Sequence, residues 1–290
     1  MSRATLAVIG GSGFYQMEGL TEVETVRIAT PFGEPSDAIT IGTLEGVRTA
    51  FLPRHGVGHR LSPTELPQRA NIWALKSLGV AYIISISAVG SLREELRPGD
   101  FVIPDQLIDK TYARPNTFFG RGLVAHVGFA DPFCPNLRAV VHQAALDAGA
   151  VSHFGGIYVV MEGPQFSTRA ESNLHRAWGA DLIGMTALPE AKLAREAEIC
   201  YVTVACVTDY DVWHEVEADV SVDLVLENLR RNVETSKRLV RLAAARLPRR
   251  DCPCPNALAG AIITAPELIP DQVKRDLAPI VGRYLGVPAS

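Results

Sequence analysis

The pattern of apolar and polar positions along the chain predicts alternating strands and helices. Runs rich in β-branched residues indicate strands, and several intervening segments have the apolar spacing of amphipathic helices. The expected strands are residues 5–10, 38–43, 47–53, 81–87, 156–161, 181–184 and 199–208. The expected helices are residues 66–78, 136–149, 168–178, 187–197 and 221–245. This alternation is typical of an α/β protein with a mixed, partly parallel sheet.

The ends of the elements divide the chain into a main domain and an extension. Val222, Leu226 and Leu229 lie on one apolar stripe, which makes 221–245 the clearest predicted helix. A segment with three prolines follows it and closes the compact region. We therefore expect a single domain over residues 1–250. Residues 251–290 would form a C-terminal helical extension packed on the same domain or on a neighbouring subunit.

Composition indicates an ordinary globular protein. The 290 residues are 47% hydrophobic and 21% charged, with a formal net charge of -4. This mild acidity argues against a nucleic-acid or membrane-surface partner. The chain has no apolar run of about 18 residues, so we expect no transmembrane helix. Its first residues lack the features of a signal peptide, and we expect a cytoplasmic protein.

The five cysteines are few and odd in number, which favours reduced thiols in the cytosol. Cys252 and Cys254 form a Cys-Pro-Cys pair. A zinc site needs two further ligands, which this pair lacks by itself. We therefore expect two thiols in a loop rather than a redox or disulfide pair, and no bound metal.

The glycine-rich turn in VIGGSGFY admits more than one interpretation. Gly11 and Gly13 match the dinucleotide fingerprint, but Gln16 stands where the third glycine belongs. A nicotinamide oxidoreductase is therefore disfavoured. The turn could still hold an anion through its amides and the Ser12 hydroxyl. Taken alone, the stretch favours a plain structural turn.

Other strand ends carry possible phosphate donors. Arg54 and His55 follow one predicted strand, Ser87 ends another, and Thr186 stands at a predicted helix start. Each has an ordinary alternative, a solvated loop for Arg54 and His55 or a simple N-cap for Thr186. Together, hydroxyl, arginine and histidine donors at separate strand ends indicate a pocket for inorganic phosphate.

Two carboxylates and an aromatic residue complete the candidate chemistry. Asp209 and Asp211 follow a buried run, where they could cap the next helix, bind a metal or act as acids. In a dry site, burial raises a carboxyl pKa and allows it to donate a proton to a leaving group. Phe166 precedes the predicted helix 168–178 and could line a pocket or simply pack in the core.

Several long motifs resemble one known family. They are IGGSGFY, TPFGEPSD, RHG, QRANIWALKSLG, SAVGSLREELRPGD, MEGPQFSTRAES, GADLIGMTALPEAKLAREAEICY and TDYDVW. Over about residues 5 to 250 they resemble the trimeric purine nucleoside phosphorylase family, and within it the members that act on S-methyl-5'-thioadenosine. The resemblance implies a single α/β domain with a mixed, partly barrel-like sheet flanked by helices. It also implies phosphorolysis to adenine and 5-methylthioribose 1-phosphate, with inorganic phosphate as co-substrate and no cofactor.

The resemblance assigns roles to individual residues. The implied phosphate-binding residues are Ser12, Arg54, His55, Ser87, Ala88 and Thr186. Phe166 would pack on the purine, and Met185 would contact the ribose hydroxyls. Asp209 and Asp211 would face the base, with Tyr210 contributing mainly its backbone. Asp209, as the acid that protonates N7, and His55 would be the catalytic residues.

Specificity and assembly also follow from the resemblance. Ser167 and Asp209 point to a 6-aminopurine, because a carboxylate accepts a hydrogen bond from an amino group. Val222 would lie beside the methylthio group, and His126 would reach a neighbouring subunit's site, which implies a homo-oligomer, a trimer or a hexamer. The alternatives are a phosphorylase for 6-oxopurine nucleosides or methylthioinosine, and a nucleoside-binding protein without turnover. The cysteine pair resembles one that forms a disulfide in thermostable members.

Overall fold

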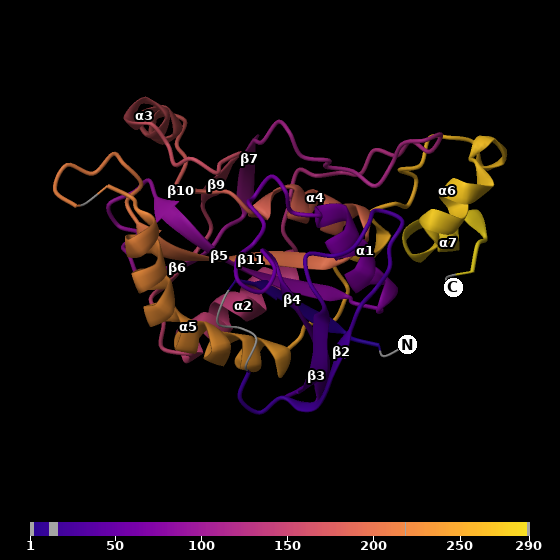
Figure 1. The fold of residues 1–290 in the computed structure, drawn as a ribbon, viewed down its shortest axis with the longest axis horizontal. Helices are drawn as coiled ribbons and strands as arrows, with labels where there is room; N and C mark the ends of the chain where they lie inside the picture. Colours follow the sequence, from indigo (N-terminus) through magenta and orange to yellow (C-terminus); the bar gives the residue numbers. More distant parts are fainter. Residues whose placement is uncertain (1–2, 12–16, 218, 289–290) are drawn as a thin grey trace.

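The computed structural model describes residues 3–11, 17–217 and 219–288, and Figure 1 shows its ribbon. The strands are β1 (Leu6–Gly10), β2 (Thr21–Val26), β3 (Ile39–Leu44), β4 (Val47–Pro53), β5 (Tyr82–Ser91), β6 (Phe101–Ile103), β7 (Gln106–Lys110), β8 (Ser152–Phe154), β9 (Ile157–Met161), β10 (Leu182–Gly184) and β11 (Cys200–Asp209). The helices are α1 (Gln68–Ser77), α2 (Pro135–Asp147), α3 (Arg169–Ala177), α4 (Ala187–Glu196), α5 (Val222–Ala244), α6 (Asp271–Asp276) and α7 (Ala278–Leu285). The expected α/β architecture is confirmed.

The strands form one mixed sheet that branches at β5. The main path runs β2-β3-β4-β1-β5-β10-β9-β7, and β11 leaves β5 to pair with β6, which pairs with β8. The central strands β4, β1, β5 and β11 are parallel. Strands β6 and β7 follow each other closely in the chain but lie on different branches, so the branches curve toward each other. This curvature gives the sheet its partly barrel-like form.

Helices cover both faces of the sheet, and the central strands are apolar on both sides (Figure 1). In β1, Leu6 and Val8 face the layer of α2 and α5. Ala7 and Ile9 face the layer of α1 and α4. Alternate side chains of a strand point to opposite faces, so burial on both faces requires the continuous apolar runs seen in the sequence.

The long helix forms where the sequence predicts it, but its buried face differs in its first half. The Ser221 hydroxyl caps α5 by accepting a hydrogen bond from the Leu224 amide. Val222 is 62% exposed and Leu226 41% exposed, whereas Asn228 is buried and donates to the Thr208 carbonyl at 2.7 Å. The apolar stripe thus identifies the helix correctly, yet part of it faces outward in the single chain.

Strands β2, β6, β7 and β8 were absent from the sequence prediction. β2 is an edge strand with the mostly polar sequence TEVETV and mostly exposed side chains. β6, β7 and β8 are only three to five residues long. Such segments lack the long alternation that marks a strand, and neighbouring strands recruit them through backbone hydrogen bonds.

The C-terminal segment packs on the body of its own chain. The Trp73 indole donates to the Asp276 carbonyl at 2.8 Å, and Arg283 pairs with Glu198 at 2.9 Å. Ile280 and Val281 of α7 are buried in the same core as α1, and Figure 1 shows α6 and α7 beside α1. A domain boundary at residue 250 stays a prediction. Over the described residues, each helix is too short or too polar to cross a membrane.

Candidate active site

The carboxyl ends of four parallel strands meet at one edge of the sheet. Ile9 of β1 lies opposite Ser85 of β5, and Ala88 of β5 lies opposite Cys206 of β11. The Arg54 amide donates to the Gly10 carbonyl at 3.0 Å, which places the end of β4 beside the end of β1. Open α/β sheets hold ligands at such an edge. Ser12 follows β1 but lies outside the described residues.

A pair of hydroxyls marks the middle of this edge. The Ser87 and Thr186 oxygens lie 2.9 Å apart, because β10 runs antiparallel to β5 and brings Thr186 back to Ser87. Thr186 makes no side-chain capping bond to α4, so the simple N-cap alternative is wrong. The half-buried Ala88 follows Ser87 on β5. Two residues predicted to bind phosphate are thus in direct contact.

The Arg54 side chain is fixed by hydrogen bonds to buried groups of the protein. Its guanidinium is buried and pairs with Glu190 at 3.1 Å, where Glu190 is fully buried. It also donates to the Ser85 hydroxyl at 2.6 Å and to the Ile86 carbonyl at 2.9 Å. Burial alone would lower the Arg54 pKa, but the Glu190 carboxylate outweighs it and raises the pKa.

The sequence therefore did not reveal the internal partners of Arg54. It suggested an open fork for phosphate oxygens, whereas these partners occupy all but one Nη1 hydrogen of the guanidinium among the described residues. The paired carboxylate also offsets the positive charge. Any phosphate contact by Arg54 would use that remaining hydrogen.

His55 is a neutral imidazole of defined tautomer. Its Nδ1 lies 2.8 Å from the Leu61 carbonyl, which only accepts, so Nδ1 carries the hydrogen. Burial, followed by the charge of Arg54, lowers the His55 pKa to about 4. Its Nε2 is consequently an acceptor at neutral pH, rather than the second donor expected from sequence. It suits the P–OH group of hydrogen phosphate.

Asp209 is a buried carboxyl at the end of β11. The pairing register between β11 and β5 shifts between Val207 and Asp209 at the end of β11. Asp209 consequently lies opposite Gly90 of β5. A Cβ at Gly90 would lie 2.8 Å from Asp209 Oδ1, so only glycine leaves room for this carboxyl. Burial raises the Asp209 pKa to about 6, although the Thr208 hydroxyl donates to it at 2.7 Å.

Asp211 turns toward the same edge through an unusual backbone. Its φ is +52°, a left-handed value that side chains rarely adopt. Its amide donates to Asp209 Oδ1 at 2.8 Å, and burial raises its own pKa. Among the described residues its Oδ2 has no hydrogen-bond partner at normal distance, but the nearby Ser172 and Ser167 hydroxyls still lower its pKa in part. A donor on a ligand would satisfy this buried oxygen more fully.

The residues expected around the base and ribose lie in different environments. Phe166 is 40% exposed, so the alternative of core packing is wrong. Ser167 is buried, with its hydroxyl 3.8 Å from Met161 Sδ. The Met185 carbonyl accepts from Arg114 at 2.6 Å. The Tyr210 hydroxyl reaches the Glu94 carbonyl at 3.2 Å, so the Tyr210 ring is anchored elsewhere.

Two further expected residues are exposed in the single chain. Val222 begins α5 with an exposed side chain. His126 is exposed, and its amide donates to the Ala261 carbonyl at 3.0 Å. It lines a hollow with apolar residues that include Phe119 and Phe129. Both side chains therefore lie on the surface of the single chain.

Sequence reasoning missed the residues that hold the site from behind. Glu190 lies in the predicted helix 187–197, and its charge amid apolar neighbours was the available signal. Arg114 pairs with Glu162 at 3.1 Å, both buried, and also holds the Leu188 carbonyl at 2.7 Å. Arg114 lies in a loop without any periodic pattern, so nothing in the sequence singled it out.

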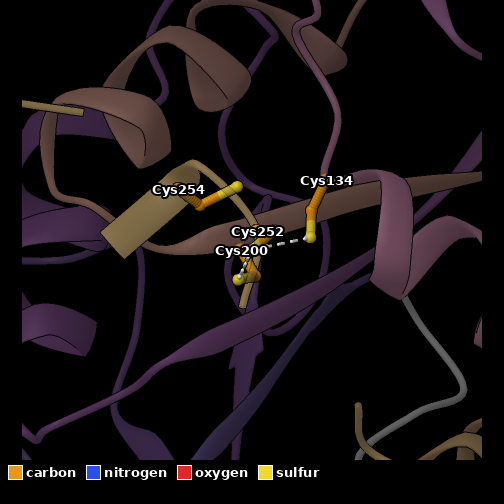
Figure 2. A group of neighbouring side chains, drawn as sticks. All are labelled: Cys134, Cys200, Cys252 and Cys254. Atoms are coloured by element: carbon orange, nitrogen blue, oxygen red, sulfur yellow. Dashed lines mark hydrogen bonds between the residues drawn. The ribbon is translucent and has the colours of Figure 1, made fainter. Parts of the chain in front are cut away.

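The expectation that Cys252 and Cys254 have no further ligands beside them is wrong. The fold brings Cys134 and Cys200 to the pair, and the four sulfurs lie within 4.8 Å of one another. These residues are distant in sequence, so only the tertiary structure could reveal the group (Figure 2).

Comparisons with known proteins agree with this geometry. The model of the phosphorylase superfamily matches residues 5–245. The chain is 57% identical to S-methyl-5'-thioadenosine phosphorylase of Geobacter sulfurreducens, over 97% of this chain and 99% of that protein. A methylthioadenosine phosphorylase from an antarctic soil metagenomic library has a TM-score of 0.92 at 50% identity, over 97% and 99% of the two chains. A mutant adenosine/methylthioadenosine phosphorylase from Schistosoma mansoni, in complex with adenine, has a TM-score of 0.81 at 40% identity, over 84% and 92%. The chain therefore belongs to the phosphorylase superfamily.

Proposed function

We propose that this protein cleaves S-methyl-5'-thioadenosine with inorganic phosphate, giving adenine and 5-methylthioribose 1-phosphate. The observation that carries the proposal is the meeting of the Ser87–Thr186 hydroxyl pair and the buried Asp209 at one sheet edge. The relatives named for this reaction support it. Inorganic phosphate is a co-substrate, and we infer no cofactor.

Phosphate would lie under C1' of the sugar, held by donors from separate strand ends. We assign Ser12, Ser87 and Thr186 hydroxyls, the Ala88 amide and the last Nη1 hydrogen of Arg54 to it. His55 would accept a hydrogen bond from the P–OH group of hydrogen phosphate on Nε2 and so orient the attacking oxygen, while the proton stays on phosphate. Held in line, phosphate supplies both the nucleophile and a charge that stabilises the oxocarbenium-like transition state.

Asp209 would act as the general acid. As phosphate bonds to C1', the electron pair of the C1'–N9 bond moves into the purine, and the Asp209 proton passes to N7. A pKa near 6 keeps roughly a tenth of this carboxyl protonated at pH 7. Such a transfer contributes about 10²–10⁴-fold in rate.

Selectivity for the base and the 5' group would come from the residues that surround the phosphate-binding donors. The buried carboxylate of Asp211 suits the amino group of adenine, and Ser167 supplies a hydroxyl rather than a carboxylate at its position. The exposed face of Phe166 would stack on the purine, and Met185 would contact the ribose hydroxyls. Val222 would contact the methylthio group.

We further infer a cytoplasmic homo-oligomer, a trimer or a hexamer. Val222 and Leu226 on α5 and the hollow around His126 leave apolar surface uncovered in one chain. In an assembly, His126 would complete the site of the neighbouring subunit. Reduced, unpaired cysteines suit the cytoplasm.

The test is to incubate purified protein with methylthioadenosine, adenosine, inosine and methylthioinosine, with and without phosphate, and to quantify the released bases. We expect methylthioadenosine to react fastest and only with phosphate. Equal cleavage without phosphate would make the protein a hydrolase. Much faster cleavage of methylthioinosine would support the alternative of 6-oxopurine substrates.

A variant pair isolates the role of the acid. Asp209→Asn should lower turnover of methylthioadenosine at least 100-fold and shift preference toward 6-oxopurines, because an amide can donate to O6. Asp223→Asn removes a carboxylate from the exposed first turn of α5 and serves as the matched control. Equal rates for both variants would contradict the assignment.

A further inference from the structure

Four cysteines from three parts of the chain meet on the side of the molecule covered by α2 and α5. Cys134 is the residue before α2, and Cys200 is the first residue of β11. Cys252 and Cys254 lie in the C-terminal extension, where Cys254 opens a short 3-10 helix. Figure 2 shows their side chains turned toward one another. All four are buried, and the proposed phosphorolysis uses none of them.

The sulfur positions fit a metal ion better than disulfide bonds. Cys252 Sγ lies 3.6 Å from Cys134 Sγ and 3.5 Å from Cys200 Sγ, and all four sulfurs lie within 4.8 Å of one another. Zinc with four thiolates at about 2.3 Å places neighbouring sulfurs about 3.8 Å apart. A disulfide requires about 2.05 Å. The separations of the four sulfurs are therefore close to those of a tetrahedral tetrathiolate site.

The four cysteines are free thiols in the described structure, and their sulfurs share one buried space. A bound cation would favour the thiolate at every sulfur and so join the four groups into one site.

Arg250 links the two chain segments that carry three of the four cysteines. It precedes Cys252 by two residues and donates to the carbonyl of Glu198, which precedes Cys200 by two residues. This contact helps to hold the two segments side by side.

We propose that Cys134, Cys200, Cys252 and Cys254 bind one zinc ion as a structural site that fixes the C-terminal extension to the main domain. Four S–H bonds break, four Zn–S bonds form, and four protons leave to solvent. With four protein ligands the ion has no open position, so the site is structural rather than catalytic. The segment that it anchors continues to Ala261, which pairs with His126.

The first test is the metal content of the wild-type protein, purified with a reducing agent and without chelator. We expect one zinc per chain by elemental mass spectrometry. Protein stripped of metal should bind Co²⁺ with the visible absorption bands of a tetrahedral thiolate site. Its melting temperature should fall by about 10 °C relative to the zinc form.

Variants separate this site from cysteine chemistry in general. Cys252→Ser and Cys254→Ser should lower zinc content at least fivefold. The matched control is Cys206→Ser, because Cys206 is also buried in β11 but lies outside the cluster, with its sulfur 3.9 Å from the Ser236 hydroxyl. This control should keep its zinc. Zinc loss in the control alone would overturn the assignment.

The wild-type measurements keep the proposal testable even if the variants do not fold. Failure of the reduced, metal-free protein to bind either Zn²⁺ or Co²⁺ would overturn it. A Cys252–Cys254 or Cys134–Cys200 disulfide found by peptide mass spectrometry in metal-free purified protein would overturn it as well. Phosphorolysis activity is measured separately, so failure of either proposal leaves the other intact.

Discussion

The buried Arg54–Glu190 pair allows a sharp test of how the phosphate edge is held together. In the wild type, the Ser85 and Tyr201 hydroxyls donate to Glu190 Oε1. In Glu190→Gln, the carboxamide oxygen can still accept these two hydrogen bonds. Its NH₂ group cannot accept from Arg54. The guanidinium would then remain buried with its charge uncompensated.

The structure sets the size of the expected effect. The Arg54 and Glu190 side chains are 3% and 0% exposed, so solvent screens the pair very little. Removing one partner of such a pair costs about 3–5 kcal/mol. For a chain of this size, each kcal/mol lowers the melting temperature by about 2–4 °C. We therefore expect a fall of roughly 6–20 °C for Glu190→Gln.

The assay is thermal unfolding followed by circular dichroism, with Glu45→Gln as the matched control. Glu45 pairs with Arg241 at 2.7 Å, but those side chains are 37% and 43% exposed. An exposed pair contributes about 0–1 kcal/mol, so the control should melt within about 4 °C of the wild type. If the two variants lost equal stability, burial would not be the source of the pair's strength.

Four further predictions concern the reaction and the stability of its proposed acid. Ser87→Ala should raise the KM for phosphate about 10- to 150-fold and leave the KM for the nucleoside unchanged in steady-state kinetics, because a hydrogen bond to an anion contributes about 1.5–3 kcal/mol. The Asp209 pKa is raised to about 6, so the acid form is lost above that pH, and kcat/KM should fall with rising pH unless Asn replaces Asp209. Since the folded state binds this proton more tightly than the unfolded state, its stability should also fall as pH rises from about 4 to 6, as measured by denaturation at each pH. Gly90→Ala puts a methyl 2.8 Å from Asp209 Oδ1 and 3.1 Å from Ile183 Cγ2, so kcat should fall at least tenfold, whereas Gly128→Ala, with no atom within 4 Å, should retain wild-type activity.

Long apolar runs were the most predictable part of the fold. Strands β5 and β11 and helix α5 lie within a few residues of their predicted bounds, because burial on both sheet faces or along one helix face imposes a continuous pattern. Strands β6 and β8 were missed, since three residues carry no period and pair only because a neighbouring strand is already in place.

The sequence identified most residues of the candidate site, but it did not reveal which of them contact one another. Ser87, Thr186 and Asp209 stand at predicted strand or helix ends, and the sheet brings all three to one edge. The pairing of Arg54 with Glu190 joins residues 136 positions apart. No local pattern encodes such a distance, and the sequence suggested an arginine open to phosphate instead.

The sequence alone determined the alternation of strands and helices, the set of candidate donors and the family resemblance, because each depends on residues close together in the chain. Only the tertiary structure decided which of these groups face each other and which protonation states they adopt. It made His55 neutral, raised the Asp209 pKa and gathered four cysteines. Burial and contacts between distant segments set these properties, and both arise only when the sheet brings those segments together.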